Sequence, residues 1–328
     1  MTRRKPCLAG ERARQACIDM PDASTRTLAD YLLRKYPKTY RDFEHARGRV
    51  RYYRGESGVH NRVRSTPRIA TTKFVAPLSD AHAPAPYEMT IQGKGMLISD
   101  VHVPYHDKVA FEMAVNHAIS AGCTDYLIIL GDFIDHYQLS RYAHDPEARN
   151  FAGEIEIARG MLRDLAGVFG KIIYKAGNHE QRYIDYMRLR APALIGVPQF
   201  TFPRVLGLED IDADFVAWNS VIHVGGKLTL LHGHEFGGSV FSPVNPARGL
   251  FLRSKACAIC GHHHQTSQHD EPNVRGTALT TWSLGCLCDL HPEYMPFNRW
   301  NHGFAEFSFG GGNEWQVENR RIVHGKVR

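Results

Sequence analysis

The sequence lacks any apolar run that approaches the roughly 18 consecutive residues of a membrane-spanning helix. Its first ten residues are basic, and no apolar signal-peptide core follows them. A disulfide framework is not indicated either, because the seven cysteines of this 328-residue chain are an odd number and fit reduced thiols better. These absences predict a cytoplasmic protein with no membrane partner.

Acidic residues are scarce in the N-terminal part of the chain. Residues 1–75 hold 18 lysines and arginines against 7 acidic residues, whereas the remainder holds 22 and 27. An anionic partner is therefore expected at the N-terminus first. Composition divides the chain into a basic helical module at 1–60, a proline-bearing linker at 61–86, and a region of alternating strands and helices at 87–328.

The N-terminal module is predicted to contain two short helices, Thr27–Tyr36 and about Tyr40–Tyr53, separated by a break at Pro37. This pattern looks like a helix-turn-helix variant whose second helix enters a groove of nucleic acid. The second helix region carries the arginines that would contact mainly phosphates: Arg41, Arg47, Arg49, Arg51 and Arg54. A solvated basic extension, or a segment that mediates self-assembly, is the alternative.

Short apolar runs alternate with helical patterns in the larger region. The predicted strands are 96–99, 126–130, 171–176, 228–231 and 256–260, and the predicted helices are 108–121 and 154–168. This order argues for an α/β fold in which a sheet packs between helices and functional loops lie at the strand ends.

Each of the five predicted strands is followed by a loop that carries metal-ligand chemistry. The loops read Asp100-Val101-His102, Gly131-Asp132-Phe133-Ile134-Asp135, Gly177-Asn178-His179-Glu180, His232-Gly233 and Gly261-His262-His263-His264. A strand holds its end rigidly, so one or two side chains from each loop can converge on a common point. The glycines permit the tight turns that this convergence requires.

This series resembles the signature of calcineurin-like metallophosphoesterases, which is D-x-H, G-D-x-x-D, G-N-H-[DE], H and G-H-x-H in that order, over about residues 95–290. The resemblance implies a β-sandwich flanked by helices and two divalent metal ions. It assigns the first ion to Asp100, His102, Asp132 and His264, and the second to Asp132, Asn178, His232 and His262. Mixed nitrogen and oxygen ligands suit Mn²⁺, which we expect first, or Fe, Zn, Ni or Co.

The resemblance also implies the chemistry, in which a hydroxide activated by two metals attacks phosphorus in line. His179 would act on the leaving-group oxygen as proton donor or electrostatic stabiliser, and Asp135 would orient it. His136 stands where Ser/Thr protein phosphatases have a phosphate-binding arginine, which argues against a protein phosphatase. His136, Arg182 and Arg141 are the candidates for substrate phosphate contacts.

The expected function is hydrolysis of phosphate esters, with a phosphodiesterase or nuclease acting on nucleic acid as the first hypothesis. A basic helical arm joined to these motifs is similar to metallophosphoesterases of bacteria and their phages. One alternative is a phosphomonoesterase that acts on a nucleotide or another small phosphate. The other is a DNA-binding protein whose phosphoesterase domain is inactive. The sequence does not decide the metal, the oligomeric state, or the choice among DNA, RNA and nucleotide.

The cysteines suggest a second metal site. Cys257-x-x-Cys260 and Cys286-x-Cys288 have spacings that suit tetrahedral zinc. Both pairs, however, lie in apolar runs, where cysteine commonly behaves as a small buried residue. We therefore favour buried thiols and leave zinc as the alternative.

Two further expectations concern histidines and aromatic residues. His234 follows His232 so closely that a shifted register is the alternative, and we favour His232 because it is the histidine that precedes glycine in the matching motif. Three aromatic side chains are expected in the core rather than at a substrate platform: Trp282, Trp300 and Phe304.

Overall fold

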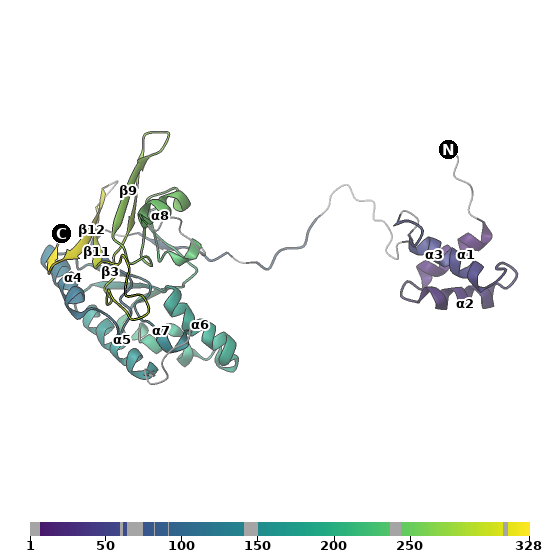
Figure 1. The fold of residues 1–328 in the computed structure, drawn as a ribbon, viewed down its shortest axis with the longest axis horizontal. Helices are drawn as coiled ribbons and strands as arrows, with labels where there is room; N and C mark the ends of the chain where they lie inside the picture. The colour runs from purple at the N-terminus through teal and green to yellow at the C-terminus, as the bar shows by residue number, and fades with distance from the viewer. Residues whose placement is uncertain are drawn as a thin grey trace. The chain divides into compact units, whose positions relative to one another are not determined.

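The structure is a computed structural model that describes residues 7–59, 62–63, 75–81, 83–90, 92–140, 150–236, 244–310 and 314–328. The chain divides into two compact units, Met1–Ala81 and His82–Arg328 (Figure 1). Part of the predicted linker therefore lies outside the described residues. None of the described helices is long and apolar enough to span a membrane.

The first unit contains three helices, α1 (Leu8–Asp19), α2 (Thr25–Lys35) and α3 (Phe43–Arg54). The side chains of Ser24 and Asp42 cap α2 and α3 by accepting backbone N–H groups at 3.0 and 2.7 Å. The apolar faces of the helices meet in a small core: Ala13, Ala16, Leu28, Ala29, Leu32, Tyr40, Ala46 and Val50. This unit therefore has a core of its own.

The two predicted helices, Thr27–Tyr36 and about Tyr40–Tyr53, correspond to α2 and α3. The prediction differs from the structure in two respects. It assigned no separate helix to α1, whose buried face consists mainly of alanines and is weakly apolar. Seven residues, from Tyr36 to Asp42, separate α2 from α3. A helix-turn-helix motif has a turn of three to four residues. The unit is a three-helix bundle with a longer connection.

The second unit is a sandwich of two sheets. The seven-stranded sheet has the order β13-β12-β11-β2-β3-β4-β5, and the six-stranded sheet has the order β1-β6-β7-β8-β10-β9. The strands of the first sheet are β2 (Gly93–Ile98), β3 (Tyr126–Leu130), β4 (Lys171–Lys175), β5 (Asp214–Val216), β11 (Gly303–Phe309), β12 (Trp315–Val323) and β13 (Lys326–Val327). Those of the second are β1 (Tyr87–Met89), β6 (Ile222–Val224), β7 (Leu228–Leu231), β8 (Ala258–Cys260), β9 (Ser267–Pro272) and β10 (Ala278–Ser283).

Helices cover the outer faces of both sheets. The helices of this unit are α4 (Lys108–Ala121), α5 (Phe151–Ala166), α6 (Asn178–Arg190), α7 (Phe202–Leu206) and α8 (Pro246–Ser254). The helices α4 to α7 share a core with the seven-stranded sheet, whereas α8 packs on the six-stranded sheet (Figure 1). The predicted fold class, a β-sandwich flanked by helices, is confirmed.

The alternating direction of side chains along the central strands explains why the seven-stranded sheet packs against helices on one face and against the other sheet on the opposite face. Leu97 and Ile128 face the other sheet, whereas Met96 and Leu127, their neighbours in sequence, face the helices. Successive side chains of a strand point to opposite faces, so a strand that is apolar at every position must be covered on both sides. Each fully buried aliphatic side chain contributes about 1.5–3 kcal/mol. The sheet ends are therefore held firmly enough to position a site.

Candidate metal centre

The carboxyl ends of five strands bring the predicted ligands together. The strands β2, β3, β4 and β5 are parallel, and so are β7 and β8. Parallel strands end at the same edge of a sheet, where their loops meet. The ligands that follow β2, β3, β4, β7 and β8 are, in that order, Asp100, Asp132, Asn178, His232 and His262.

The loops that carry these ligands have an uncommon backbone. Six of the nine non-glycine residues with positive φ in the described part of the chain lie in them: Asp100, His102, Asp132, His136, His262 and His264. Each such residue costs on the order of 1–3 kcal/mol and persists only where the surrounding structure holds it. The strain turns side chains that are close in sequence toward one point.

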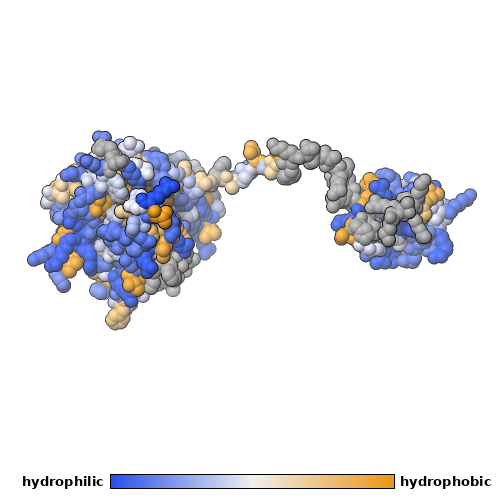
Figure 2. Space-filling view, turned by 90° about the horizontal axis from the view of Figure 1, so that it is seen from above, coloured by the Kyte–Doolittle hydropathy of each residue, from blue (hydrophilic) through white to orange (hydrophobic). Residues whose placement is uncertain are grey.

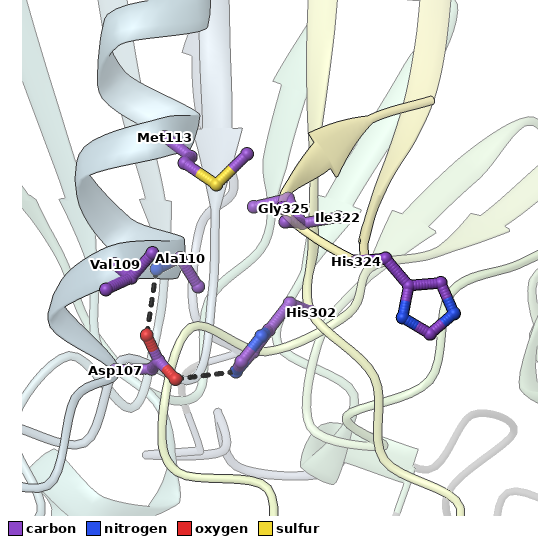
Figure 3. A pocket seen from close by; sticks show the side chains of 8 residues that line it. All are labelled: Asp107, Val109, Ala110, Met113, His302, Ile322, His324 and Gly325. Carbon is purple, nitrogen blue, oxygen red and sulfur yellow. Dashed lines mark hydrogen bonds and ion pairs between the residues drawn. The ribbon is translucent and has the colours of Figure 1, made fainter.

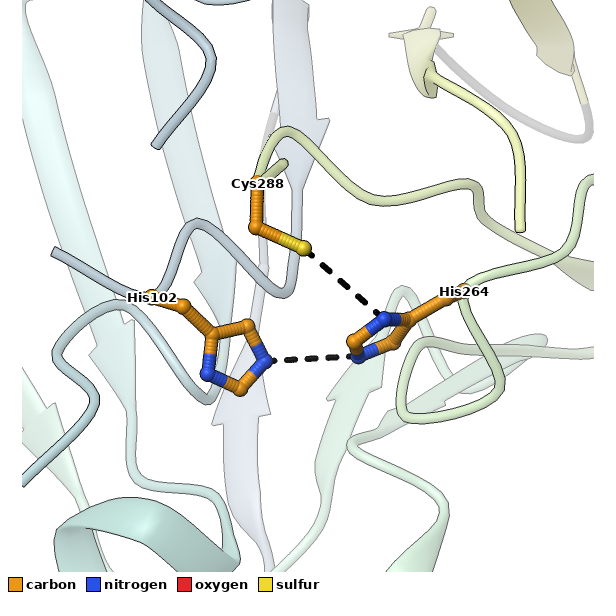
Figure 4. Close-up of side chains that lie close together, drawn as sticks. All are labelled: His102, His264 and Cys288. Carbon is orange, nitrogen blue, oxygen red and sulfur yellow. Dashed lines mark hydrogen bonds between the residues drawn. The ribbon is translucent and has the colours of Figure 1, made fainter. Parts of the chain in front are cut away.

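One group of side chains is centred on two histidines (Figure 4). The Nε2 atoms of His102 and His264 lie 3.3 Å apart, and Nε2 of His264 lies 3.1 Å from Oδ1 of Asp100. The other oxygen of Asp100 accepts the backbone N–H of His262 at 2.8 Å. The Cys288 sulfur lies 3.8 Å from Nδ1 of His264, the ring nitrogen other than the one that approaches Asp100 and His102.

A second group is centred on Asp132. Its Oδ2 lies 3.2 Å from Nε2 of His232, and Oδ1 of Asn178 lies 3.0 Å from the same nitrogen. Ligand atoms of Asp132, His232 and His262 all lie within 4.8 Å of one another. The same limit holds between ligand atoms of Asp132 and His102. Asp132 therefore faces both groups.

The donor set fits divalent cations. Asp100 is fully buried, and its Oδ1, although 3.1 Å from Nε2 of His264, accepts no hydrogen bond of suitable geometry within the described residues. Such an oxygen is costly unless a cation satisfies it. Burial opposes ionisation, but the neighbouring histidines hold the pKa values of Asp100 and Asp132 well below their usual range. Both side chains are therefore carboxylates, as metal ligands must be.

Protons and metal cations compete for the ring nitrogens of the histidines in the two groups. Burial disfavours the charged rings, but Asp132 raises the pKa of His232 to about 9, and Asp100 raises the pKa of His264 to about 10. Burial and the nearby His232 lower the pKa of His262 to about 3. A metal ligand must be an unprotonated ring nitrogen, so bound cations would displace protons here.

His179 lies beside both groups on the first turn of α6. Its Nδ1 lies 2.7 Å from the carbonyl oxygen of Asp135 and 3.0 Å from that residue's Oδ1, which also lies 2.9 Å from Nδ1 of His102. Burial opposes the cation, but Asp132 and Asp135 outweigh it and raise the pKa of His179. Arg182 works the other way, and its Nη2 lies 3.0 Å from Nε2 of His179. Asp135 therefore orients two histidines, where the resemblance implied one.

Two glutamates whose roles sequence reasoning missed hold these loops in place: Glu180, which is buried, and Glu235, which is largely buried. Glu180 accepts the backbone N–H of Asp132 at 2.9 Å. Glu235 accepts the backbone N–H of His232 at 2.9 Å and forms an ion pair of 2.7 Å with the buried Lys175. The last position of the G-N-H-E motif was a signal for Glu180, whereas no motif marked Lys175.

Some predicted residues do not reach the centre. His136 was expected to contact substrate, but it is fully buried, and its Nδ1 lies 3.0 Å from the carbonyl oxygen of His179. This expectation was wrong, because aromatic rings surround His136 and burial lowers its pKa to about 4. Arg182 does lie beside His179, and it donates to the carbonyl of Asp135 at 2.8 Å. Arg141 lies outside the described residues.

In the fourth loop, His232 rather than His234 is the histidine that approaches Asp132. The His234 ring lies next to that of His232, with the two ring centroids 5.3 Å apart. Nδ1 of His234 lies 3.7 Å from the Glu235 carboxylate, and burial lowers the pKa of this ring to about 4. The shifted register is therefore not the one in the structure.

The four candidate zinc cysteines are all buried. Among the described residues, one group of possible metal ligands contains a cysteine, and it consists of Cys288, His102 and His264. Burial raises the pKa of Cys260 to about 12, which keeps it a thiol. Cys257 and Cys260 pack as apolar residues in the hydrophobic core, whereas Cys286 and Cys288 lie next to His264.

A cavity of about 130 Å³ lies between the start of α4 and the turn from β12 to β13 (Figure 3). His302 lines it, with Nε2 3.8 Å from Asp107 and donating to the carbonyl of Cys288 at 2.9 Å. None of the predicted metal ligands lines this cavity. It is therefore separate from the metal centre.

The arginines of the N-terminal unit lie at its surface, where Figure 2 shows mainly hydrophilic residues. Arg47 pairs with Glu44 at 3.1 Å, and Arg51 pairs with Glu56. Exposed ion pairs of this kind contribute only about 0–1 kcal/mol to stability, so another anion can replace the glutamate at little cost. Arg54 instead donates to the carbonyl of Ala23 and helps to hold the bundle together. Two of the five predicted arginines remain. Arg41 pairs with Asp42 at 2.9 Å, and Arg49 is partly exposed.

Comparison with known proteins places this geometry in a family. The family described as calcineurin-like phosphoesterase matches residues 94–281. The chain is 26% identical over 230 residues to the Gene 54 protein of Mycobacterium phage L5, a match that covers 66% of this chain and 89% of the relative. It is 25% identical over 228 residues to the Gene 54 protein of Mycobacterium phage D29, covering 67% and 85%.

Two solved structures are also similar. One is a single mutant of Vps29 from Entamoeba histolytica, with 13% identity, a TM-score of 0.37, and coverage of 72% of this chain and 96% of that chain. The other is a cold-active protein-tyrosine phosphatase of a psychrophilic Shewanella species, with 12% identity, a TM-score of 0.37, and coverage of 74% and 82%.

The family match spans more than half of the chain, and its motif residues meet at one buried centre. Members of this family bind divalent metal ions, and the clustered aspartates and histidines are the residues that would hold them. The chain belongs to the calcineurin-like phosphoesterase family and is a phosphoester hydrolase.

Proposed function

We propose that this protein is a phosphodiesterase that uses two divalent cations and acts on nucleic acid. The observation that carries the proposal is the placement of Asp132, whose carboxylate lies within reach of His102 in one group of ligands and of His232 in the other. Two cations at such a site lower the pKa of water and neutralise charge on a phosphate. Mn²⁺ is the first candidate among the cations that suit mixed nitrogen and oxygen donors, which also include Fe, Zn, Ni and Co.

The protein's own residues supply the remaining roles. Asp100, His102, Asp132 and His264 would hold one cation, and Asp132, Asn178, His232 and His262 would hold the other. His179 would give a proton to the leaving-group oxygen through Nε2, because Asp135 contacts its other ring nitrogen. Arg182 would contact a phosphate oxygen, since its guanidinium lies beside that Nε2.

The N-terminal unit would bind the phosphate backbone of the nucleic acid. Its helix α3 carries Arg47 and Arg51 one turn apart on one face, and both pair with exposed glutamates. A nucleic-acid phosphate can replace such a partner, and the released counterions favour binding at low salt. The unit would thus raise the concentration of substrate near the metal centre.

The experiment is a comparison of substrates on the full chain loaded with Mn²⁺. We expect bis-p-nitrophenyl phosphate to be hydrolysed with a higher kcat/KM than p-nitrophenyl phosphate, and single-stranded or duplex nucleic acid to be cleaved. Preference for the monoester, with no cleavage of nucleic acid, would instead assign a phosphomonoesterase. No turnover of any substrate with Mn²⁺, Fe²⁺, Zn²⁺, Ni²⁺ or Co²⁺ would contradict the proposal.

A further inference from the structure

A loop at residues 289–300 presents aromatic side chains that the core does not use. Tyr294 is 74% exposed and Phe297 is 97% exposed. Trp300 was expected in the core together with Trp282 and Phe304, and those two are buried, but Trp300 is only partly buried. An exposed aromatic cluster in a folded domain commonly marks a surface that binds a ligand.

The loop is ordered by its own hydrogen bonds. The Asn298 side-chain amide donates to the carbonyls of Leu290 and Met295 at 2.7 and 2.9 Å, and its oxygen accepts the backbone N–H of Trp300 at 2.9 Å. A ring on a loop held in this way loses little conformational freedom when a ligand arrives. The exposed rings are therefore arranged before binding.

The loop lies directly against the metal centre. The Trp300 ring centroid is 4.1 Å from that of His264, and the backbone N–H of Asn301 donates to the His264 carbonyl at 2.9 Å. The Tyr294 ring meets Trp300 edge-on, with centroids 6.4 Å apart. The aromatic surface thus begins at a predicted metal ligand and extends outward through Tyr294.

A backbone hydrogen bond joins the start of this loop to Tyr105, which is 46% exposed and whose carbonyl accepts the Asp289 N–H at 2.9 Å. A group bound on this surface would lie next to a phosphate at the metal centre.

We propose that Tyr294 and Trp300 form a stacking platform for the base of a nucleotide whose phosphate lies at the metal centre. Every nucleobase has a flat π-face, so two adjoining rings bind bases without selecting among them. This inference rests on the proposed function and deepens it, because it assigns nucleoside-bearing phosphates, rather than small aliphatic ones, as the substrate class.

The test is a binding measurement that does not need turnover. Thymidine 5′-monophosphate and 2-deoxyribose 5-phosphate are titrated into the full chain with Mn²⁺ by calorimetry. We expect the nucleotide to bind about tenfold more tightly, as one base–aromatic contact implies. Tyr294→Leu and Trp300→Leu should each reduce that ratio to about twofold or less. Equal affinities for the two ligands in the unmodified chain, or a ratio that survives both substitutions, would overturn the platform.

Two controls keep the interpretation specific. The affinity for 2-deoxyribose 5-phosphate reports on the metal centre, and we expect Tyr294→Leu to leave it unchanged. Tyr52→Leu removes a 41% exposed ring from the N-terminal unit and should leave the nucleotide preference intact. If Tyr52→Leu abolished the preference as strongly as Tyr294→Leu, the assigned location would be wrong.

Hydrolysis of thymidylyl-thymidine separates this inference from the phosphodiesterase proposal. Base-dependent binding without hydrolysis of the dinucleoside phosphate would leave the platform standing and contradict the proposed activity. Hydrolysis with base-independent binding would do the reverse. If the protein both binds the base and hydrolyses the dinucleoside phosphate, an abasic analogue of that substrate should be hydrolysed with about tenfold lower kcat/KM.

Discussion

The two units of this protein use charge in opposite ways. In the catalytic unit, Asp100, Asp132 and Lys175 are buried, and their partners come from loops far away in the sequence. In the N-terminal unit, charges such as Arg47 lie at the surface, and their partners are three to five residues away. Burying several charges at one point costs free energy, so such a cluster persists only where the fold holds it and a function requires it. Exposed charges carry no such cost. The first pattern identifies a site, and the second identifies only a preference for anions.

The largest effect that sharpens this contrast is expected at His179. His179→Ala should lower kcat by about a hundredfold to ten-thousandfold, because the leaving-group oxygen loses its proton donor. Metal content should stay unchanged, because none of the proposed ligands is altered. Steady-state kinetics and elemental analysis on the same sample measure both quantities. Full turnover in the variant would refute the role of His179, and His223→Ala, a histidine paired with Glu88 on the β1–β6 edge, is the control.

A second large effect concerns stability at two lysines of the same strand. Lys175→Met leaves the Glu235 carboxylate buried without its partner, and breaking such a pair costs about 3–5 kcal/mol. Lys171→Met, at the other end of β4, removes partly exposed ion pairs with Asp212 and Asp214 and should cost no more than about 1 kcal/mol. Urea unfolding measures both. Equal losses in the two variants would remove the distinction between buried and exposed charge.

A smaller effect is a pH dependence at Glu154, a buried side chain of α5 that accepts the backbone N–H of His136. Burial raises the pKa of Glu154 to about 7. The folded state therefore favours the protonated acid, and stability falls as pH rises from the unfolded-state pKa through about 7. Glu154→Gln keeps an acceptor for the N–H and removes this loss.

The stability of Glu154→Gln relative to the unmodified chain should accordingly increase by about 2–3 kcal/mol between pH 5 and pH 8, as urea unfolding at the two pH values would measure. Glu156→Gln, at an exposed position of the same helix, is the control for general effects of charge removal. A stability difference for Glu154→Gln that is independent of pH would show that this carboxyl is not perturbed by burial.

The smallest effect is expected in the N-terminal unit. Replacing both Arg47 and Arg51 by glutamine should weaken duplex DNA binding about tenfold at low salt and reduce the slope of log affinity against log salt by about two. Arg188→Gln with Arg190→Gln removes the same charge from the end of α6 and should change neither by as much. Fluorescence anisotropy across a salt series measures both pairs. If the two pairs behave alike, the N-terminal unit has no special part in binding.

The sequence predicted the fold class and the loops of the metal centre because short strands and motif residues are local signals. A strand such as Tyr126–Leu130 shows itself as an apolar run, and the residue that follows it must lie at a sheet end. The roles of Glu180 and Lys175 were missed because they depend on tertiary contacts that no spacing reveals.

The same limit explains the errors at His136 and Trp300. His136 is close in sequence to the ligand Asp132, and its own left-handed backbone conformation directs its side chain. Trp300 is far in sequence from every predicted ligand and meets His264 through a tertiary contact. His136 turns into the core, and Trp300 turns out of it to pack against His264. In the N-terminal unit, α1 was missed because small alanine side chains give a weak periodic signal.

The central claim is that Asp132 holds two cations together, and metal stoichiometry tests it most directly. The full chain, reconstituted with Mn²⁺ and freed of excess metal, should contain about two ions per chain by inductively coupled plasma mass spectrometry. Asp132→Asn should lose at least one of them, together with activity, while Asp270→Asn on the exposed strand β9 should retain both. Two tightly held ions in Asp132→Asn, or none in the unmodified chain, would contradict the account.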